Sequence, residues 1–545
     1  MKVHVVWQSY LPETPSRGYW DTALTEDVFG GKVWTPVLGH EFVSCNGFAE
    51  LPADAEGCVV VLPGMKQAAF VDRLNADIAR LRWVLVLLVG DEASVFPAEQ
   101  VKHPNMRLWV MMPKKGRHDF ADRYLTNGYT TETHRLAGLP GIHPRPLDWF
   151  FSGQITHARR EQCRDALSRS PNGKLNCTPG FTQGMTPQEY YTVMATAKIV
   201  PCPSGACGPD SFRFSEALEA GCVPIVDGTS PIADYPAGYW EYVFGPELPF
   251  PVVDNWDALP WLMDSLVKAW PENATRCSAW WQQYKRRLVY DVEDDIRELS
   301  GVPAHVGEVQ DKITVLIPTS PIPSHPDTAM VEQTILSVRR HMPRAEIILM
   351  FDGVRPAMEH RRGQYEEYKR RLLWKCNHDW HNVLPVVFDT HTQQADMLRA
   401  TLDLVRTPLV LFIEHDAYFV DGPIQWDAIV ATLLSGAANM IRLYYYAELH
   451  PEHNYLMRGT VNLNGARFVK TVQYSQWPNV ATVEFYRRIL DEHFERGQKK
   501  MIETVMYSPV AESSWDAHKV MIYYPEGGAR QWIHNNGREN DPCDW

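Results

Sequence analysis

The stretch "CPSGACGPDSFRFSEALEAGCVPIV", residues 202–226, determines the fold that we expect for the first half of the chain. It consists of a loop rich in small residues, a helical pattern that begins at about Asp210 or Ser211, and an apolar run that follows Gly221 and includes Pro224. A loop, a helix and a buried strand in direct succession are typical of parallel sheets covered by helices. The stretch therefore predicts an α/β fold.

The same alternation extends to both sides of this stretch. Up to residue 112 the candidate strands are "VHVVW", "CVVVLPG", "WVLVLLVG" and "MRLWVMM". A second set consists of "LDWFFSG", "KIVPCPSG" and "CVPIVDG", with helical patterns such as "QEYYTVMATAK" between them. These two sets predict two Rossmann-like lobes, residues 1–135 and 136–305. A long helical pattern at 274–299 is followed by the breaker "SGVPAHVG", which predicts a domain boundary.

The strand and helix pattern restarts after this boundary. The strand "ITVLIPTSP" at 313–321 is followed by the helix "AMVEQTILSVRRHM", the strand "EIILMFDG", the helix "QQADMLRATLDLV" and the strand "PLVLFIEHD". After about residue 440 the pattern is mixed and rich in tyrosine. We therefore expect a third domain, residues 310–545, of α/β type with a mixed sheet.

Composition narrows the classes of partner and compartment. The chain of 545 residues has 53 Lys and Arg against 66 Asp and Glu, a net charge of −13. This balance disfavours nucleic acid and anionic membrane surfaces as partners, although a local basic patch would still allow them. Its 10 cysteines include no Cys-x-x-Cys pair, and the amino terminus lacks the apolar core of a signal peptide. We expect a cytoplasmic protein with reduced thiols and no membrane span.

The loop and helix at 204–216 have the chemistry of an anion site. The N-terminus of a helix offers unpaired amide donors and the positive end of the helix dipole, and glycines let a ligand approach the backbone. Arg213 is suited to a bidentate contact with phosphate, and Glu216 to a pair of sugar hydroxyls. The alternative is a capped helix with Asp210 or Ser211 as the N-cap and with Arg213 and Glu216 as a surface pair. The candidate residues are Ser204, Gly205, Ser211, Arg213 and Glu216.

Residues 200–226 closely resemble the signature of the exostosin-like glycosyltransferases, family 47. The segments "RPLDWFFSGQ" at 145–154 and "HPNMRLW" at 103–109 are similar to further family segments. The resemblance implies a GT-B fold without a metal, with Arg213 on the donor diphosphate, Glu216 on the ribose and the loop at Ser204 and Gly205 near the phosphates. The chain lacks the membrane anchor of the family's eukaryotic members, which favours a bacterial, phage or viral enzyme.

A second group of polar residues follows a strongly apolar strand in the third domain. Glu414, His415 and Asp416 lie in "LVLFIEHDAYFV". Carboxylates at a strand end can hold Mg²⁺ or Mn²⁺ with positions left open for a diphosphate. The alternative is an ordinary strand-end turn. From the residues alone, the metal site is a hypothesis.

The order of elements in the third domain resembles the GT-A glycosyltransferases of the family 2 kind. This resemblance implies that the loop after the first strand and an acid after the second strand bind the nucleotide, and that Asp416 is the principal metal ligand. Glu414 stands where the family usually has an aspartate, which leaves its role open. His534 is either the third ligand or a surface-loop histidine. The implied nucleotide-sugar residues are Pro318, Thr319, Asp352, Glu414 and Arg538, and the implied metal ligands are Asp416 and His534.

A transfer by single displacement needs a general base for the acceptor hydroxyl. Glu512 and Asp516, in "VAESSWDAH", fall where inverting GT-A enzymes place such a carboxylate, and we favour Asp516. Trp515 beside it is a candidate surface for stacking a sugar. The alternative is an acid cluster at a helix N-terminus.

The sequence thus predicts a two-module glycosyltransferase, with a GT-B lobe pair followed by a GT-A domain. It would transfer sugars from nucleotide-sugar donors, UDP-sugars favoured, to a glycan or other hydroxyl acceptor with inversion, and only the second module would use Mn²⁺ or Mg²⁺. Three alternatives stay open. One module could be a docking domain, the acceptor could be DNA bases as in phage enzymes, or the chain could be a non-enzymatic glycan-binding scaffold.

Overall fold

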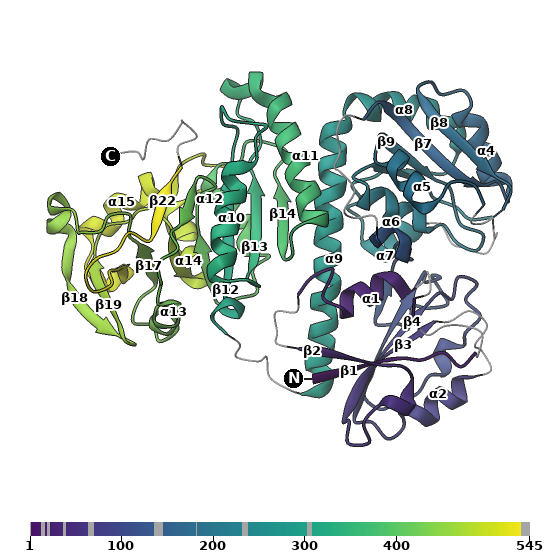
Figure 1. Cartoon of the computed structure of the whole chain (residues 1–545), viewed down its shortest axis with the longest axis horizontal. Helices are drawn as coiled ribbons and strands as arrows, with labels where there is room; N and C mark the ends of the chain where they lie inside the picture. Colours follow the sequence, from purple (N-terminus) through teal and green to yellow (C-terminus); the bar gives the residue numbers. More distant parts are fainter. Residues whose placement is uncertain are drawn as a thin grey trace. The chain divides into compact units, whose positions relative to one another are not determined.

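The computed structural model describes residues 2–11, 17–18, 22–35, 40–63, 70–135, 145–180, 183–231, 238–301 and 308–535. The chain divides into two compact units (Figure 1). Unit 1 comprises Met1–His305 with Leu373–Asp379, and unit 2 comprises Val306–Leu372 with Trp380–Trp545. Both units are α/β, as the sequence predicts. None of the helices in the described ranges is long and apolar enough to cross a membrane.

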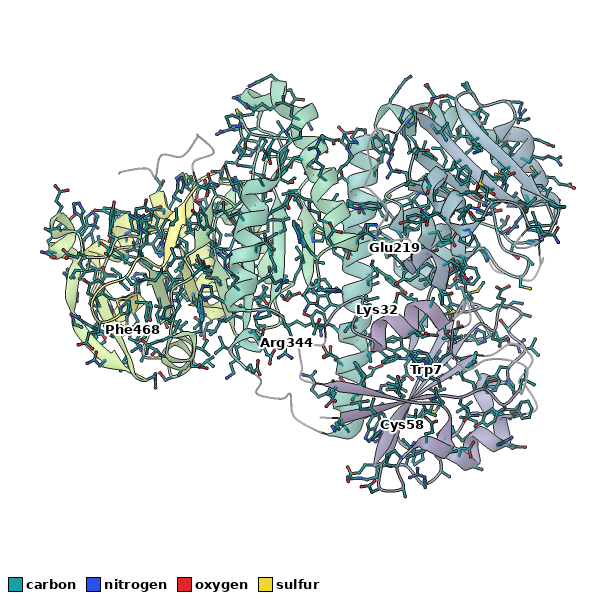
Figure 2. All side chains as sticks on the ribbon, in the orientation of Figure 1. Trp7, Lys32, Cys58, Glu219, Arg344 and Phe468 are labelled. Atoms are coloured by element: carbon teal, nitrogen blue, oxygen red, sulfur yellow. The ribbon has the colours of Figure 1, made fainter. Side chains whose placement is uncertain are left out.

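The first lobe of unit 1 is a six-stranded parallel sheet in the order β2-β1-β3-β4-β5-β6. Every residue of the central strands β3 and β4 is buried, as expected for a parallel sheet covered on both faces. The side chains of Trp7 and Cys58 are buried within this lobe (Figure 2). The elements are β1 (Lys2–Trp7), α1 (Ala23–Phe29), β2 (Glu41–Cys45), β3 (Gly57–Pro63), α2 (Val71–Ile78), β4 (Trp83–Val89), β5 (Met106–Met111), β6 (Arg123–Leu125) and α3 (Thr131–Arg135).

The second lobe is a five-stranded parallel sheet in the order β11-β10-β9-β7-β8. The three strands expected from the sequence are β7, β9 and β10, and the helix of residues 202–226 is α6. The proposed lobe boundary at residue 135 stays a prediction, because 136–144 lie outside the described residues. The elements are β7 (Leu147–Gln154), α4 (Ala158–Leu167), β8 (Gly173–Thr178), α5 (Pro187–Met194), β9 (Ala197–Cys202), α6 (Phe212–Glu219), β10 (Val223–Asp227), α7 (Tyr239–Phe244), β11 (Val252–Val253) and α8 (Leu259–Lys268).

The helix α9 (Trp270–Ser300) has 31 residues and packs against both sheets of unit 1, contacting β4 and β5 of the first and β10 of the second (Figure 1). Towards its end, the Asp295 carboxylate accepts a hydrogen bond of 2.7 Å from the Trp109 indole of the first lobe. Nearer its start, Trp281 and Lys285 donate to Glu219 of the second lobe at 2.6 and 2.7 Å. The helix therefore joins the two lobes by buried polar contacts.

Unit 2 contains a nine-stranded mixed sheet in the order β14-β13-β12-β15-β20-β17-β21-β19-β18 and a ribbon of β16 and β22. β12, β13, β14, β15, β17 and β21 run in one direction, whereas β20 and β19 run against their neighbours. The strands expected at 313–321, 346–353 and 408–416 are β12, β13 and β15. Its strands are β12 (Ile313–Thr319), β13 (Glu346–Phe351), β14 (Val383–Val387), β15 (Leu409–Phe412), β16 (Ala417–Phe419), β17 (Met440–Leu443), β18 (Met457–Leu463), β19 (Ala466–Thr471), β20 (Asn479–Thr482), β21 (Val520–Tyr523) and β22 (Trp532–His534), and its helices are α10 (Ala329–His341), α11 (Arg362–His378), α12 (Gln394–Leu402), α13 (Trp426–Leu434), α14 (Val483–His493), α15 (Ile502–Glu512) and α16 (Trp515–His518).

Candidate functional sites

Each unit has a topological switch point, where successive connections from adjacent strands leave in opposite directions. In the second lobe of unit 1 this point lies between β7 and β9, and in unit 2 it lies between β12 and β15. Ligands of open α/β sheets bind outside the carboxyl ends of the strands at such points. The residues singled out from the sequence follow β9 in unit 1 and β15 in unit 2, so the topology brings both groups to these positions.

Arg213, in the first turn of α6, occupies the switch point of unit 1. Its Nη2 donates to the carbonyl of Ser152 at 2.7 Å, and the guanidinium lies 4.6 Å from the centre of the Phe151 ring. Nε and Nη1 are buried and have no hydrogen-bond partner among the residues that the structure describes. A Cβ at Gly153 would lie 2.4 Å from Nη2, so the glycine makes room for the guanidinium. The arrangement leaves two buried donors for a ligand.

A second cation, Arg160 of α4, is electrostatically coupled to Arg213. Arg160 donates to the carbonyls of Ser204 and Gln154, each at 3.1 Å. Burial and the charge of Arg213 lower the pKa of Arg160 to about 10, while Glu92 opposes this decrease. The positive charge of Arg213 disfavours the charged form of the half-buried Arg160, and a bound anion would oppose this effect. The electrostatics of the site therefore favour a negatively charged ligand.

The loop before α6 contributes two further polar atoms. The hydroxyl oxygens of Ser204 and Ser211 are buried, and neither forms a hydrogen bond within the described part of the chain. Ser211 is the N-cap residue of α6, but its side chain makes no capping hydrogen bond. A Cβ at Gly205 would come within 2.9 Å of the Asp210 carbonyl oxygen, so the loop is tight there. The alternative of a side-chain-capped helix does not apply to Ser211.

Glu216 is buried, with 7% of its surface exposed, rather than paired on the surface. Its carboxylate accepts hydrogen bonds from Tyr190 at 3.0 Å and from Thr133 at 3.2 Å. Burial raises its pKa, and these hydrogen bonds together with the charge of Arg213 oppose the increase. Ionised carboxylates have about four lone-pair positions, so the protein's donors leave capacity for a ligand hydroxyl.

Asp210 holds the start of α6 against the segment that follows β6. Its Oδ2 accepts from the Thr126 hydroxyl at 2.8 Å, the Asn127 amide at 2.8 Å and the Tyr239 hydroxyl at 3.1 Å. Burial raises the pKa of Asp210 to about 6, against the effect of these hydrogen bonds. From the sequence we expected only a possible N-cap at this position, because its partners lie 29 to 84 residues away along the chain.

In unit 2 the structure brings Asp416 and His534 together. Asp416 Oδ2 lies 3.3 Å from His534 Nε2. The ribbon of β16 and β22 produces this contact, because it places Ala417 opposite His534. Burial alone would raise the pKa of Asp416, but the hydrogen bond from His534 and the nearby charge of His415 hold it below its ordinary value. The carboxylate is therefore ionised and adjacent to an imidazole.

This pair fits a divalent ion only in part. Asp416 Oδ1 is buried and has no partner in the described residues, so it is available as a ligand. The described residues contain no group of three or more His, Cys, Asp or Glu side chains that could hold a metal. A carboxylate and an imidazole suit an ion that takes its other ligands from phosphate and water. An imidazole suits a transition-metal ion such as Mn²⁺ better than Mg²⁺, which prefers oxygen.

A third acid, Glu503, acts on Glu414, and we did not select it from the sequence. Burial and the negative charges of Asp416 and Glu503 raise the pKa of Glu414 to about 7. Gln394 connects Glu414 to the start of α15, because its Nε2 donates to Glu414 at 3.4 Å and its Oε1 accepts from the Ile502 amide at 3.2 Å. Glu503 lies in the first turn of α15. The sequence signal that could have identified Glu503 is an acid at the start of a helix, in "KKMIETV". It lies upstream of Glu512 and Asp516, the acids that we selected.

Glu512 and Asp516 do not lie with Asp416. Both are exposed, and Asp516 belongs to α16, which leads into the amino end of β21. β21 runs in the same direction as β15, whose carboxyl end leads to Asp416, so the two positions lie at opposite edges of the sheet. Trp515 lies near Lys470, 4.2 Å from ring centre to Nζ, at that far edge. The expectation that Asp516 or Glu512 lies at the same site as Asp416 is therefore not met.

The other nucleotide-site residues gather at the switch point, with their polar atoms largely engaged. Asp352 Oδ1 accepts from the amides of Gly353 at 2.8 Å and Thr392 at 2.7 Å, and its Oδ2 lies 3.0 Å from His391 Nδ1. The Thr319 hydroxyl donates to a backbone carbonyl at 3.1 Å, and the Pro318 carbonyl lies 3.1 Å from a nitrogen of His415. Arg538 lies outside the described residues.

A histidine in the loop after β12 was not singled out from the sequence. The His325 ring stacks on Tyr368 with centroids 3.9 Å apart and on Tyr365 at 5.2 Å. Its Nε2 is buried without a partner in the described ranges. Burial and the nearby charges of His415 and Arg361 lower its pKa to about 3, so the ring is neutral. A neutral ring with an unused nitrogen is suited to a heterocyclic ligand.

No protein-family model matches the chain, and no curated protein matches it. Among solved structures it is similar to S. aureus TarS residues 1–349, with 10% identity, a TM-score of 0.26 and coverage of 41% of this chain and 60% of that one. The same fragment in complex with UDP-GlcNAc has 11% identity, a TM-score of 0.27 and coverage of 42% and 60%. The mannosyltransferase PcManGT from Pyrobaculum calidifontis, in complex with GDP-Man and Mn²⁺, has 12% identity, a TM-score of 0.26 and coverage of 40% and 55%. The chain thus spans about 55–60% of the length of these three chains, and its function is inferred from its own residues.

Proposed function

We propose that the chain is a glycosyltransferase that moves sugars from nucleotide-activated donors, UDP-sugars first among them, to a hydroxyl group of a glycan or similar acceptor. Unit 1 would bind one donor at Arg213 in a GT-B type site, and unit 2 another at Asp416 in a GT-A type site. The observation that carries the proposal is the Arg213 guanidinium, which has two buried nitrogens unpartnered in the described residues and is electrostatically coupled to a second, half-buried cation, Arg160. The resemblance of residues 200–226 to the exostosin-like enzymes supports the same ligand.

In unit 1 the chain's own donors would stabilise the diphosphate as it leaves the sugar. Arg213 and the N-terminus of α6 supply positive charge, and the hydroxyl groups of Ser204 and Ser211 supply hydrogen bonds. Donors that are already in place act most strongly where negative charge develops in the transition state. Glu216 would bind the ribose hydroxyls with its remaining lone pairs. We propose that this site works without a metal ion.

In unit 2, Asp416 and His534 would hold a divalent ion, Mn²⁺ in preference to Mg²⁺, which would neutralise charge on the departing diphosphate. We propose Glu503 as the general base, because its negative charge acts on Glu414 and Gln394 holds the start of its helix, at Ile502, against Glu414. It would take the proton of the acceptor hydroxyl, so that the oxygen attacks opposite the leaving group and inverts the sugar. The buried His325 ring would face the nucleotide base.

The experiment is a screen of nucleotide-sugar hydrolysis by the full chain, with Mn²⁺ or with a chelator. Arg213→Ala should reduce the hydrolysis that persists in chelator by about 10²–10³-fold, the cost of losing one preorganised donor. Asp416→Asn should abolish the part that Mn²⁺ stimulates. The matched controls are Arg164→Ala, which removes an exposed arginine of α4, and Asp421→Asn, which removes an aspartate that is 83% exposed.

Each outcome bears on a different part of the proposal. If Arg213→Ala abolishes all hydrolysis and Asp416→Asn changes nothing, unit 2 is not a second catalytic site. If UDP and the other nucleotides raise the melting temperature of neither unit, and no donor is hydrolysed, the chain is not a nucleotide-sugar enzyme.

A further inference from the structure

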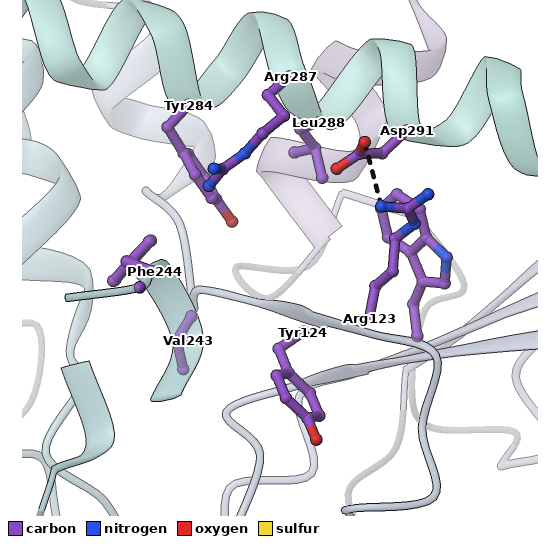
Figure 3. Close-up of a pocket in the computed structure, with 10 residues that line it drawn as sticks. Arg123, Tyr124, Val243, Phe244, Tyr284, Arg287, Leu288 and Asp291 are labelled. Atoms are coloured by element: carbon purple, nitrogen blue, oxygen red, sulfur yellow. Dashed lines mark ion pairs between the residues drawn. The ribbon is translucent and has the colours of Figure 1, made fainter. Parts of the chain in front are cut away.

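Unit 1 contains a cavity apart from the two sites described above. Its volume is about 350 Å³, and it lies between β6, the end of α7 and the helix α9 (Figure 3). Ligand pockets typically range over ~300–1,000 Å³, so this cavity suits a single sugar unit or a group of that size. None of the residues that line it belongs to the candidate sites at Arg213 or Asp416.

The cavity is lined by two arginines, of which only Arg123 forms ion pairs. Arg123 is neutralised, because it forms ion pairs with Asp291 at 3.1 Å and with Asp295 at 3.2 Å. Arg287 lies over the Tyr284 ring, 5.7 Å from its centre, and forms no ion pair or hydrogen bond with any residue that the structure describes. Figure 3 shows the Arg287 side chain alongside that of Tyr284, separate from the ion pair of Arg123 and Asp291. One positive charge in the cavity is therefore available to a ligand.

The rest of the lining combines ring faces with fixed hydroxyl groups. Tyr284 of α9 lies on one side of the cavity, with its ring centroid 5.1 Å from that of Phe244, and Tyr124 lies across from it (Figure 3). The hydroxyl oxygens of Tyr124 and Tyr242 are 2.5 Å apart, which fixes the Tyr124 ring. The Tyr284 oxygen accepts from the Thr126 amide at 3.3 Å, so its own proton is left to donate. Aromatic side chains with polar ends bind ligands that are apolar on one face and hydroxylated at the rim.

We propose that this cavity binds one acidic sugar unit of a glycan, with the sugar carboxylate on Arg287 and the ring against Tyr124 and Tyr284. An arginine matches the two oxygens of a carboxylate with two parallel hydrogen bonds, which a neutral sugar cannot accept in the same way. The pyranose ring accounts for the aromatic walls, which a free anion would not need. The cavity therefore selects a hexuronate over both a neutral sugar and inorganic phosphate.

The test measures binding to the full chain by calorimetry, with trigalacturonate as the acidic probe and galactotriose as the neutral one. Trigalacturonate should bind more tightly, and added salt should reduce the difference. Arg287→Ala should lower the affinity for trigalacturonate by about tenfold, and Arg287→Glu should abolish its binding. Arg297→Ala, on the same helix and paired with Asp294, should change the affinity by less than about twofold. Arg287 is exposed, so its replacement leaves the core intact.

Three results would overturn the inference. They are equal binding of the two trisaccharides, an Arg287→Ala variant with the affinity of the wild type, or displacement of trigalacturonate by inorganic phosphate at equal concentration. The test is independent of the proposed donor sites. Arg213→Ala should bind trigalacturonate normally, so a failure of glycosyl transfer and a failure of this cavity give different results.

Discussion

The candidate sites of units 1 and 2 lie at equivalent places in their sheets but carry opposite charge. In unit 1 the switch point holds two half-buried cations, Arg213 and Arg160, near the N-terminus of α6. In unit 2 it holds the acids Glu414 and Asp416, with Glu503 close enough to raise the pKa of Glu414 to about 7. A diphosphate is attracted to the first site directly. The second would repel it unless a cation lies between them, so the comparison predicts metal dependence in unit 2 alone.

The largest expected effect is the loss of activity when Glu503 of unit 2 is replaced, compared with the replacement of Asp516. Glu503→Gln should lower the Mn²⁺-dependent transfer by about 10²–10⁴-fold, the usual contribution of a general base. Asp516→Asn is the matched control, because Asp516 is an exposed acid at the far edge of the sheet. Transfer rates with a saturating donor measure the difference. If the Asp516 variant loses activity and the Glu503 variant does not, the base assignment is wrong.

The histidine ligand tests whether the metal belongs to unit 2. His534→Ala should raise the Mn²⁺ concentration needed for half-maximal transfer by at least about 10–100-fold, since even outer partners of metal ligands contribute that much. The activity at saturating Mn²⁺ should largely recover. A titration of Mn²⁺ with the wild type and the variant measures the shift. If His534→Ala also lowers the activity that persists in chelator, to the same extent, the comparison of the two units is contradicted, because that activity is assigned to Arg213.

The Asp210 carboxylate predicts a pH dependence of stability in unit 1. Burial raises its pKa from 3.8 to about 6 in the folded chain, so the folded state holds the proton more tightly than the unfolded state. The stabilisation is complete below about pH 4 and is lost as the pH rises through about 6, by roughly 3 kcal/mol. Asp210→Asn should remove this part of the pH dependence. Melting temperatures of the unit 1 transition at several pH values would show an unchanged slope if the assignment is wrong.

Gly153 provides a smaller steric test of the Arg213 position. In Gly153→Ala the new Cβ would lie 2.4 Å from Nη2, so the guanidinium must move. The expected cost is about 1–3 kcal/mol of stability, together with weaker protection by UDP. Gly363→Ala is a suitable control, because a Cβ there meets no heavy atom within 4 Å. Unchanged nucleotide protection in the Gly153 variant would show that the position of Arg213 does not matter.

The smallest effect concerns Ser211. Loss of a serine N-cap usually costs about 1 kcal/mol, but the Ser211 side chain makes no capping bond to α6. Ser211→Ala should therefore change the melting temperature little and lower the affinity for UDP. Thr186→Ala, which removes a complete capping box at the start of α5, should show the opposite pattern. A large loss of stability in the Ser211 variant would mean that its hydroxyl has a structural role.

The sequence was sufficient to predict the central strands of both units. Fully buried parallel strands are continuous apolar runs, and β3, β4, β12 and β15 all have this pattern. Edge strands such as β2 and β6 lack it, because they are short or partly exposed. The position of Glu512 and Asp516 relative to Asp416 could not be predicted, because the direction of α15 is not a local property. That helix starts near Gln394 and ends close to α16, so its first turn and not its last lies with Glu414.

The sequence alone determined the α/β class. It also determined the loop, helix and strand around Arg213 and the acids that follow the strand before Asp416. These are local features, set by apolar runs and by residue types at fixed spacing. Only the tertiary structure decided that His534 meets Asp416, that the charge of Glu503 acts on Glu414, and that Arg213 and Arg160 are electrostatically coupled. The physical reason is that strand register and helix packing join residues far apart in the chain, and no local pattern records which partners the packing selects.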